Sequence, residues 1–163
     1  MPGYLKILFS ALWLTLPLSV EIPIGYGAQI TAPAEILVAV IAIVLCFQLP
    51  VIQLKAHWKT LLIPVCWLLW GWICVFFSVM PLVSMKYMLV TTAYWWVFFV
   101  PVICWPQAPW GQWLKYFAIT TGMVVLWTIF RHGVYFSFRA DQANLAPMPF
   151  FDDHTVYAAL LAT

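Results

Sequence analysis

The sequence predicts an all-α, polytopic transmembrane helix bundle, and three observations lead to this fold class. Of the 163 residues, 66% are hydrophobic and only 7% are charged, whereas soluble domains carry about 25% charged residues. The apolar residues fall into five long runs, each close to the roughly 20 residues that cross a bilayer. Aromatic residues make up 18% of the chain, including 11 tryptophans, and Trp and Tyr are enriched where spans cross the interfaces. We therefore expect one membrane region over residues 1–163 and no soluble domain.

The expected spans follow one another with short connections. They cover about residues 4–20, 34–54, 61–80, 87–105 and 113–130. The connection after the first span holds Pro23, Gly25, Gly27 and Pro33, a composition that predicts a turn-rich loop. A further apolar run starts at Thr155 and stops after nine residues. We expect five complete spans and the start of a sixth, in a truncated N-terminal part of a longer protein.

Charge and cysteine content exclude several classes of function. A net charge of +2 without a long basic run does not suit a nucleic-acid partner. The four cysteines lie inside apolar runs, without a CxxC pair or histidines at ligand spacing. We expect neither a metal site nor a redox pair, and no cofactor. We interpret the cysteines as small buried hydrophobic residues.

The distribution of basic residues predicts an orientation in the membrane. The first loop holds no Lys or Arg, whereas the second holds Lys55 and Lys59, so the N-terminus is expected in the cytoplasm. Three cations then lie on the outer face against the charge rule: Lys86, Arg131 and Arg139. We expect these three cations to approach one another and to bind an anionic ligand, such as a lipid-linked phosphate. Pairing with lipid headgroups or with Asp141, Asp152 and Asp153 is the alternative.

The most polar part of the chain, residues 131–157, holds both arginines, three of the five acidic residues and two of the three histidines. Ionisable groups at the edge of a span are candidates for function. His154 follows Asp152 and Asp153, so one carboxylate could orient its imidazole as a general base. Alternatively, the histidine contacts a loop and an aspartate caps the helix start.

Within this part, Pro149-Phe-Phe-Asp-Asp-His154-Thr-Val-Tyr157-Ala-Ala resembles a segment of the O-antigen ligase and lipid-linked polysaccharide polymerase family. In that family, Phe-x-Asp-His-Thr-x-Tyr-(Gly/Ala)-Ala opens a central span after an arginine-bearing outer loop. Ser84-Met-Lys86 is similar to a Ser-x-Lys near the outer end of an earlier span. The hydropathy pattern fits most of the chain, whereas the specific motifs cover two short stretches.

The resemblance implies a bacterial inner-membrane bundle of about a dozen spans. Such proteins transfer a glycan from a polyprenyl diphosphate carrier to an acceptor hydroxyl, which belongs to a lipid A–core sugar or to another glycan. On this resemblance Lys86, Arg131 and Arg139 would face the diphosphate, and Arg139 would be catalytic, with His154 a weaker candidate. The family's large outer loop, with its further arginine and base histidine, is not in this sequence, so we expect no activity from the chain alone.

A non-enzymatic membrane subunit or a fragment of a transporter remains the alternative. The interiors of the expected spans hold no Asp, Glu, Lys or Arg. Ion-coupled transporters carry such residues near the middle of the membrane. This observation disfavours a transporter but leaves a small scaffold protein open.

Overall fold

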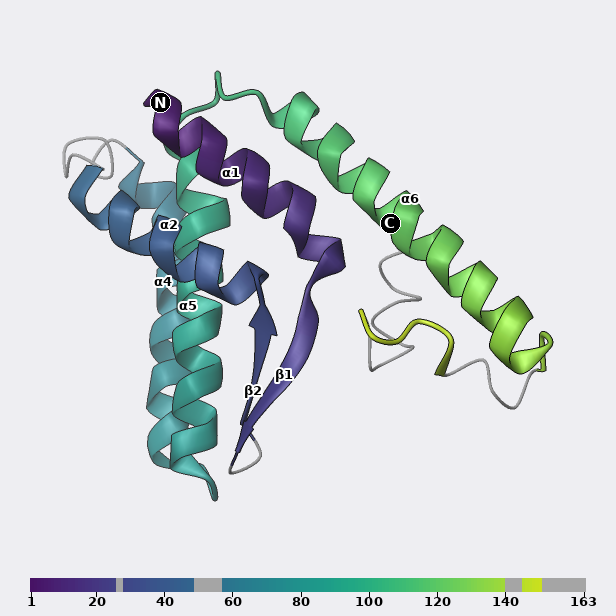
Figure 1. The fold of residues 1–163 in the computed structure, drawn as a ribbon. Coiled ribbons are helices and arrows are strands. Elements are labelled where there is room, and N and C mark those ends of the chain that lie inside the picture. Colours follow the sequence, from purple (N-terminus) through teal and green to yellow (C-terminus); the bar gives the residue numbers. More distant parts are fainter. Residues whose placement is uncertain (26–27, 49–56, 140–144, 151–163) are drawn as a thin grey trace. The chain divides into compact units, whose positions relative to one another are not determined.

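The computed structural model of the chain describes residues 1–25, 28–48, 57–139 and 145–150 (Figure 1). The described part is mostly helical, as the sequence predicts. Its α-helices are α1 (Gly3–Thr15), α2 (Ala34–Gln48), α4 (Trp58–Phe76), α5 (Pro81–Cys104) and α6 (Trp110–Phe136). A short 3-10 helix, η1 (Leu16–Leu18), extends α1, and two strands follow it: β1 (Val20–Gly25) and β2 (Ala28–Ala32).

Three of these helices, α4, α5 and α6, are long and apolar enough to cross a membrane. Their 19, 24 and 27 residues correspond to about 28, 36 and 40 Å of helix. Helix α1 has 13 residues and α2 has 15, or about 20 and 23 Å, less than the roughly 30 Å hydrocarbon core. The expectation of five complete spans is therefore not supported, and the start of the sixth lies outside the described residues.

The segment expected to be a turn-rich loop is instead a β-hairpin. Strand β1 pairs with β2 in antiparallel register, with Val20 opposite Ala32 and Ile22 opposite Ile30. The register shifts between Pro23 and Gly25. A two-stranded sheet consists only of edge strands, and an edge strand tolerates proline, which has no N–H to donate to the ladder. Pro23 and Gly25 thus mark an irregular position in a hairpin.

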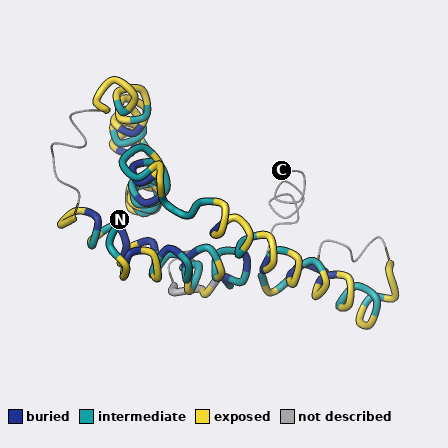
Figure 2. The backbone as a smooth tube through the Cα atoms, turned by 90° about the horizontal axis from the view of Figure 1, so that it is seen from above, coloured by how far each residue is buried: buried dark blue, intermediate teal, exposed yellow. Residues whose placement is uncertain are grey.

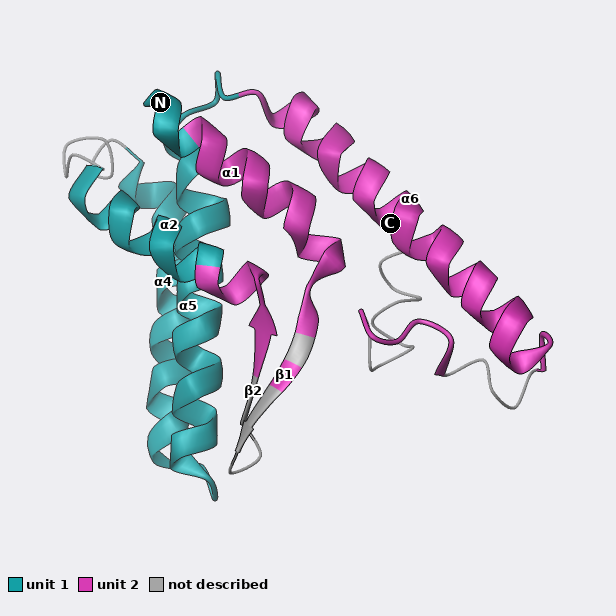
Figure 3. Ribbon diagram, viewed as in Figure 1, with its two compact units in different colours: residues 1–5, 37–108 teal, residues 6–36, 109–163 magenta. Residues whose placement is uncertain are grey.

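The chain divides into two compact units, shown in Figure 3, which we describe separately. Residues 1–5 and 37–108 form unit 1, and residues 6–36 and 109–163 form unit 2. In unit 1, α4 and α5 lie side by side. A Cβ on Gly71 would lie 2.6 Å from the methyl carbon of Met88, so the glycine permits this close approach. Trp72 Nε1 donates to Thr92 Oγ1 at 3.1 Å, which links the two helices by a polar contact.

We expect Thr92→Val to weaken the pairing of α4 with α5. Valine keeps the side-chain shape but leaves the Trp72 N–H without this acceptor. Such interhelical hydrogen bonds contribute about 0.6 kcal/mol in membranes. The free energy of unfolding, measured by denaturant titration in micelles, should fall by about this amount. Thr91→Val, the same change one residue earlier on α5, is the control and should have the smaller effect.

Many residues of the three long helices are exposed (Figure 2), and large apolar residues are among them. The most apolar 18-residue window of α4 is only 11% buried. Membrane lipid is the apolar solvent that such a surface requires. The same exposure corrects our expectation for the cysteines: Cys46, Cys66 and Cys74 are exposed, because in a membrane an apolar residue need not lie in the protein core.

In unit 2, α1 packs along the first half of α6. Trp113 is 1% exposed, its ring stacks on Phe9 at 5.1 Å, and its Nε1 donates to Ser10 Oγ at 3.0 Å. One turn further along each helix, Trp13 and Phe117 meet edge to face at 5.8 Å. These contacts hold the N-terminal half of α6 against α1. The C-terminal half of α6 carries Arg131 and the contacts of the polar part of the chain.

Candidate functional site at the end of helix α6

Helix α6 ends later than the sequence suggested, and this places Arg131 inside the helix. The expected span ended at Phe130, but the helix continues to Phe136. The half-buried Arg131 has its guanidinium 5.8 Å from the centre of the Phe136 ring, within the range of a cation–π contact. Arg131 therefore lies about 7.5 Å along the helix axis before the last residue of α6.

The chain reverses direction after α6 through two residues with left-handed backbone. Ser137 has φ 49° and Phe138 has φ 57°, a conformation that often terminates helices. The Phe138 N–H donates to the His132 carbonyl at 3.1 Å, and the Arg139 N–H donates to the Phe136 carbonyl at 2.9 Å. This reversal brings Arg139 back to the end of the helix.

Two residues of α6 accommodate the reversed segment. The Phe138 ring covers Gly133, where a Cβ would lie 2.9 Å from the ring. The His132 ring meets Phe138 edge to face at 5.4 Å, and its Nε2 lies 3.0 Å from the Arg139 carbonyl oxygen. Because a carbonyl only accepts, Nε2 carries the proton in this contact. We call residues 132–139 the reversal turn; it holds Arg139, whose side chain is exposed.

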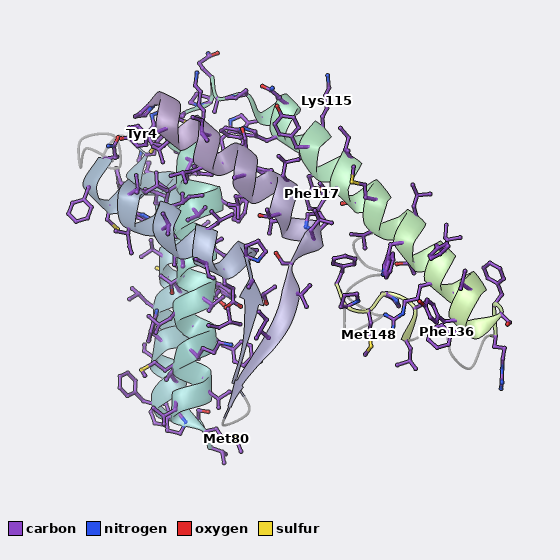
Figure 4. All side chains as sticks on the ribbon, viewed as in Figure 1. Tyr4, Met80, Lys115, Phe117, Phe136 and Met148 are labelled. Carbon is purple, nitrogen blue, oxygen red and sulfur yellow. The ribbon has the colours of Figure 1, made fainter. Side chains whose placement is uncertain are left out.

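A second segment, residues 145–150, lies against α6 and is called the strap here. Trp127 Nε1 donates to the Met148 carbonyl at 3.2 Å, and Arg131 Nη1 donates to the same oxygen. Ala146 and Pro147 of the strap are buried. In Figure 4, Met148 lies beside the end of α6 that carries Phe136, far from Lys115 at the other end. Two donors one helical turn apart thus converge on one carbonyl.

The third predicted cation, Lys86, lies in unit 1. It is inside α5, because that helix begins at Pro81 and not at Tyr87 as expected. Its Nζ lies 5.8 Å from the centre of the Tyr87 ring. At the same end of α5, the hydroxyls of Ser78 and Ser84 form a hydrogen bond of 2.6 Å. Since Lys86 and the two arginines belong to different units, the expected approach of the three cations to one another stays a prediction.

The predicted site residues therefore divide into three groups. Arg131 lies in the last turns of α6 and Arg139 just after its end, and Lys86 is described separately on α5. His154 and the acidic residues of the polar part, Asp141, Asp152 and Asp153, lie outside the described residues. Sequence reasoning missed Trp127, His132 and Gly133. The four-residue spacing of Trp127 and Arg131 was the available signal, since side chains at i and i+4 share a helix face.

The order of the long helices determines which cations share a side of the membrane. If α4, α5 and α6 each cross once, the start of α5 and the end of α6 emerge on the same side. Lys86 lies about 7.5 Å after the start of α5, and Arg131 lies about 7.5 Å before the end of α6. On the same condition, Lys59 and Lys115, near the starts of α4 and α6, would lie on the opposite side.

This arrangement predicts opposite labelling of the two ends. With the native cysteines replaced by alanine, Lys59→Cys should react with an impermeant maleimide only from the cytoplasmic side. Ser137→Cys should react only from the outer side. Both positions are exposed, and three crossings separate them. Labelling of both from the same side would contradict three single crossings.

Comparison with protein-family models, with curated proteins and with solved structures finds no match to this chain. The class that the structure itself defines is a membrane protein with three helices long enough to span.

Proposed function

We propose that this chain is part of a bacterial inner-membrane glycan transferase of the O-antigen ligase type. It would act on a polyprenyl-diphosphate-linked glycan and transfer it to an acceptor hydroxyl of a lipid A–core sugar or of another glycan. The observation that carries the proposal is the exposed Arg139, returned to the end of a long apolar helix by an ordered turn. A cation held there lies at the depth of lipid headgroups.

A cation at this position would stabilise the negative charge that the reaction leaves on the diphosphate. The acceptor oxygen forms a bond to the sugar carbon while the bond from that carbon to the diphosphate oxygen breaks. The bonding electrons leave with the diphosphate, and the hydroxyl proton passes to a base. A fixed guanidinium stabilises this leaving charge more in the transition state than in the ground state. We assign this role to Arg139 and propose Lys86 and Arg131 as further cations on the same side.

We further propose that the N-terminus lies in the cytoplasm, with the reversal turn outside. Helices α1 and α2 are either two short spans in a locally thinned bilayer or a pair that enters and leaves by the same side. Both arrangements return the chain to its starting side. The N-terminus and Lys59 therefore share one side in either case, and the positive-inside rule assigns the cytoplasm to it.

Transfer in cells tests the proposal. The complete reading frame is expressed in cells that lack the native gene, and ligated or polymerised glycan is measured relative to the amount of protein in the membrane. We expect restored transfer that depends on a polyprenyl diphosphate donor. Normal membrane insertion without any transfer would instead support a non-enzymatic membrane subunit. That alternative is favoured by one observation: Arg131 binds a backbone carbonyl of its own chain, as a purely structural arginine does.

A further inference from the structure

The Met148 carbonyl receives two hydrogen bonds from α6, and this convergence is a feature that sequence motifs did not indicate. A carbonyl oxygen has two lone pairs and can accept both donors. Trp127 supplies a neutral indole N–H at 3.2 Å, and Arg131 supplies a charged guanidinium N–H. Hydrogen bonds from charged donors are roughly twice as strong as neutral ones. Arg131 is thus the stronger of the two attachments.

Two neighbours of Met148 in the strap are buried, so the contact with α6 involves a segment of the chain and not only the Met148 carbonyl. Ala146 is 3% exposed, and Pro147 beside it is also buried. The Phe150 N–H donates to the Pro147 carbonyl at 3.2 Å, which closes a turn around Met148. The guanidinium carbon of Arg131 also lies 5.8 Å from the centre of the Phe136 ring. Arg131 thus contacts both the strap and the last residue of α6.

We propose that the two arginines have separate roles. Arg131 adds positive charge on that side but acts as a positioning residue that, with Trp127, fastens the strap to α6. Arg139 is the arginine that contacts the anionic substrate. Only the role of Arg139 in this proposal rests on the proposed function. The fastening of the strap by Arg131 holds for any function of the chain.

Labelling of the strap tests the fastening without any substrate. Ala146→Cys is introduced with the native cysteines replaced by alanine, and its reaction with a soluble maleimide is timed in membranes. We expect slow labelling in this parent. Arg131→Met removes charge and donor at similar length and should speed labelling about 10- to 100-fold. Arg131→Lys, which keeps a charged donor, should restore slow labelling in large part.

A second variant changes no charge. Trp127→Phe keeps an aromatic ring but removes the N–H, and it should speed labelling about threefold to tenfold. Trp113→Phe is the matched control, because Trp113 bonds to Ser10 at the other end of α6 and should leave labelling of the strap unchanged. Parental labelling rates in both Arg131→Met and Trp127→Phe would overturn the fastening.

Glycan transfer by the full-length protein tests whether the position of the strap affects the proposed reaction. If Arg131 is a positioning residue, Trp127→Phe lowers glycan transfer even though no charge is lost, and Arg131→Lys recovers transfer together with slow labelling. Full transfer in Trp127→Phe despite rapid labelling would overturn the positioning role. Absence of transfer in the parent itself would overturn the proposed function, while the labelling experiment would still decide the fastening.

Discussion

Replacing Arg139 by alanine in the full-length protein is expected to reduce glycan transfer by about 10²–10³-fold, because an oriented donor to developing charge typically contributes this much to the rate. The protein should remain inserted and abundant, since Arg139 is exposed and follows the end of α6. The measurement is transferred glycan per membrane-inserted protein in cells that lack the native gene. A second readout is binding of polyprenyl diphosphate in micelles, which should weaken in the variant.

Arg139→Lys should recover only part of the activity, because a point charge cannot reproduce the two parallel hydrogen bonds of a guanidinium to phosphate. The comparison variant is Lys115→Ala, which removes an exposed cation near the start of α6 and should leave transfer unchanged. If Arg139 only pairs with an acidic neighbour, Arg139→Ala will change transfer little, since exposed ion pairs contribute about 0–1 kcal/mol. That result would refute the role assigned to Arg139.

Substitution of Gly133 is expected to disrupt the reversal turn. In Gly133→Ala the new Cβ would lie 2.9 Å from the Phe138 ring, so the ring must move away from α6. Overpacking of this kind costs about 1–3 kcal/mol, offset in part by the gain of about 1 kcal/mol when alanine replaces glycine in a helix. Gly133→Val should have the larger effect, because valine is bulkier and a weaker helix former.

The rate of trypsin cleavage after Arg139, measured in micelles, reports how often the turn opens. Cleavage should be faster in the Gly133 variants than in the parent. Gly122→Ala, on the same helix but with nothing within 4 Å of the added Cβ, should not accelerate it. Gly133→Ala combined with Phe138→Gly removes the clash, so the effect of the alanine should largely vanish. An equal response at Gly122 and Gly133 would show that the ring contact does not hold the turn.

The sequence alone determined the membrane class and the approximate location of the three long spans. The reason is that the hydrophobic requirement of a bilayer is local: about 20 apolar residues are needed at each crossing. It also indicated residues 131–157 as the most polar part of the chain, of which the structure describes the end of α6, the reversal turn and the strap. The resemblance to a transferase family rests on Ser84-Met-Lys86 and on a motif that lies mostly outside the described part. No observation tests it, so it stays a prediction.

The lengths of the helices and strands could be determined only from the structure. Hydropathy extended the first expected span through η1 and into β1, because apolar residues suit a strand as well as a span. The last residues of the second expected span, 49–54, lie outside the described residues. Conversely, hydropathy ended the last long span at Phe130, where polar residues begin, although the helix runs on to Phe136. Backbone hydrogen bonding, rather than hydropathy, sets where a helix stops.

Only the tertiary structure decided how the two arginines differ. In sequence both are basic residues at the outer end of a span. In the structure, Arg131 reaches a carbonyl 17 residues further along the chain, while the reversal turn leaves Arg139 exposed. That difference depends on a glycine that leaves room for an aromatic ring and on a strap that returns to α6. Contacts between such distant residues arise from packing and leave no periodic signal in the sequence.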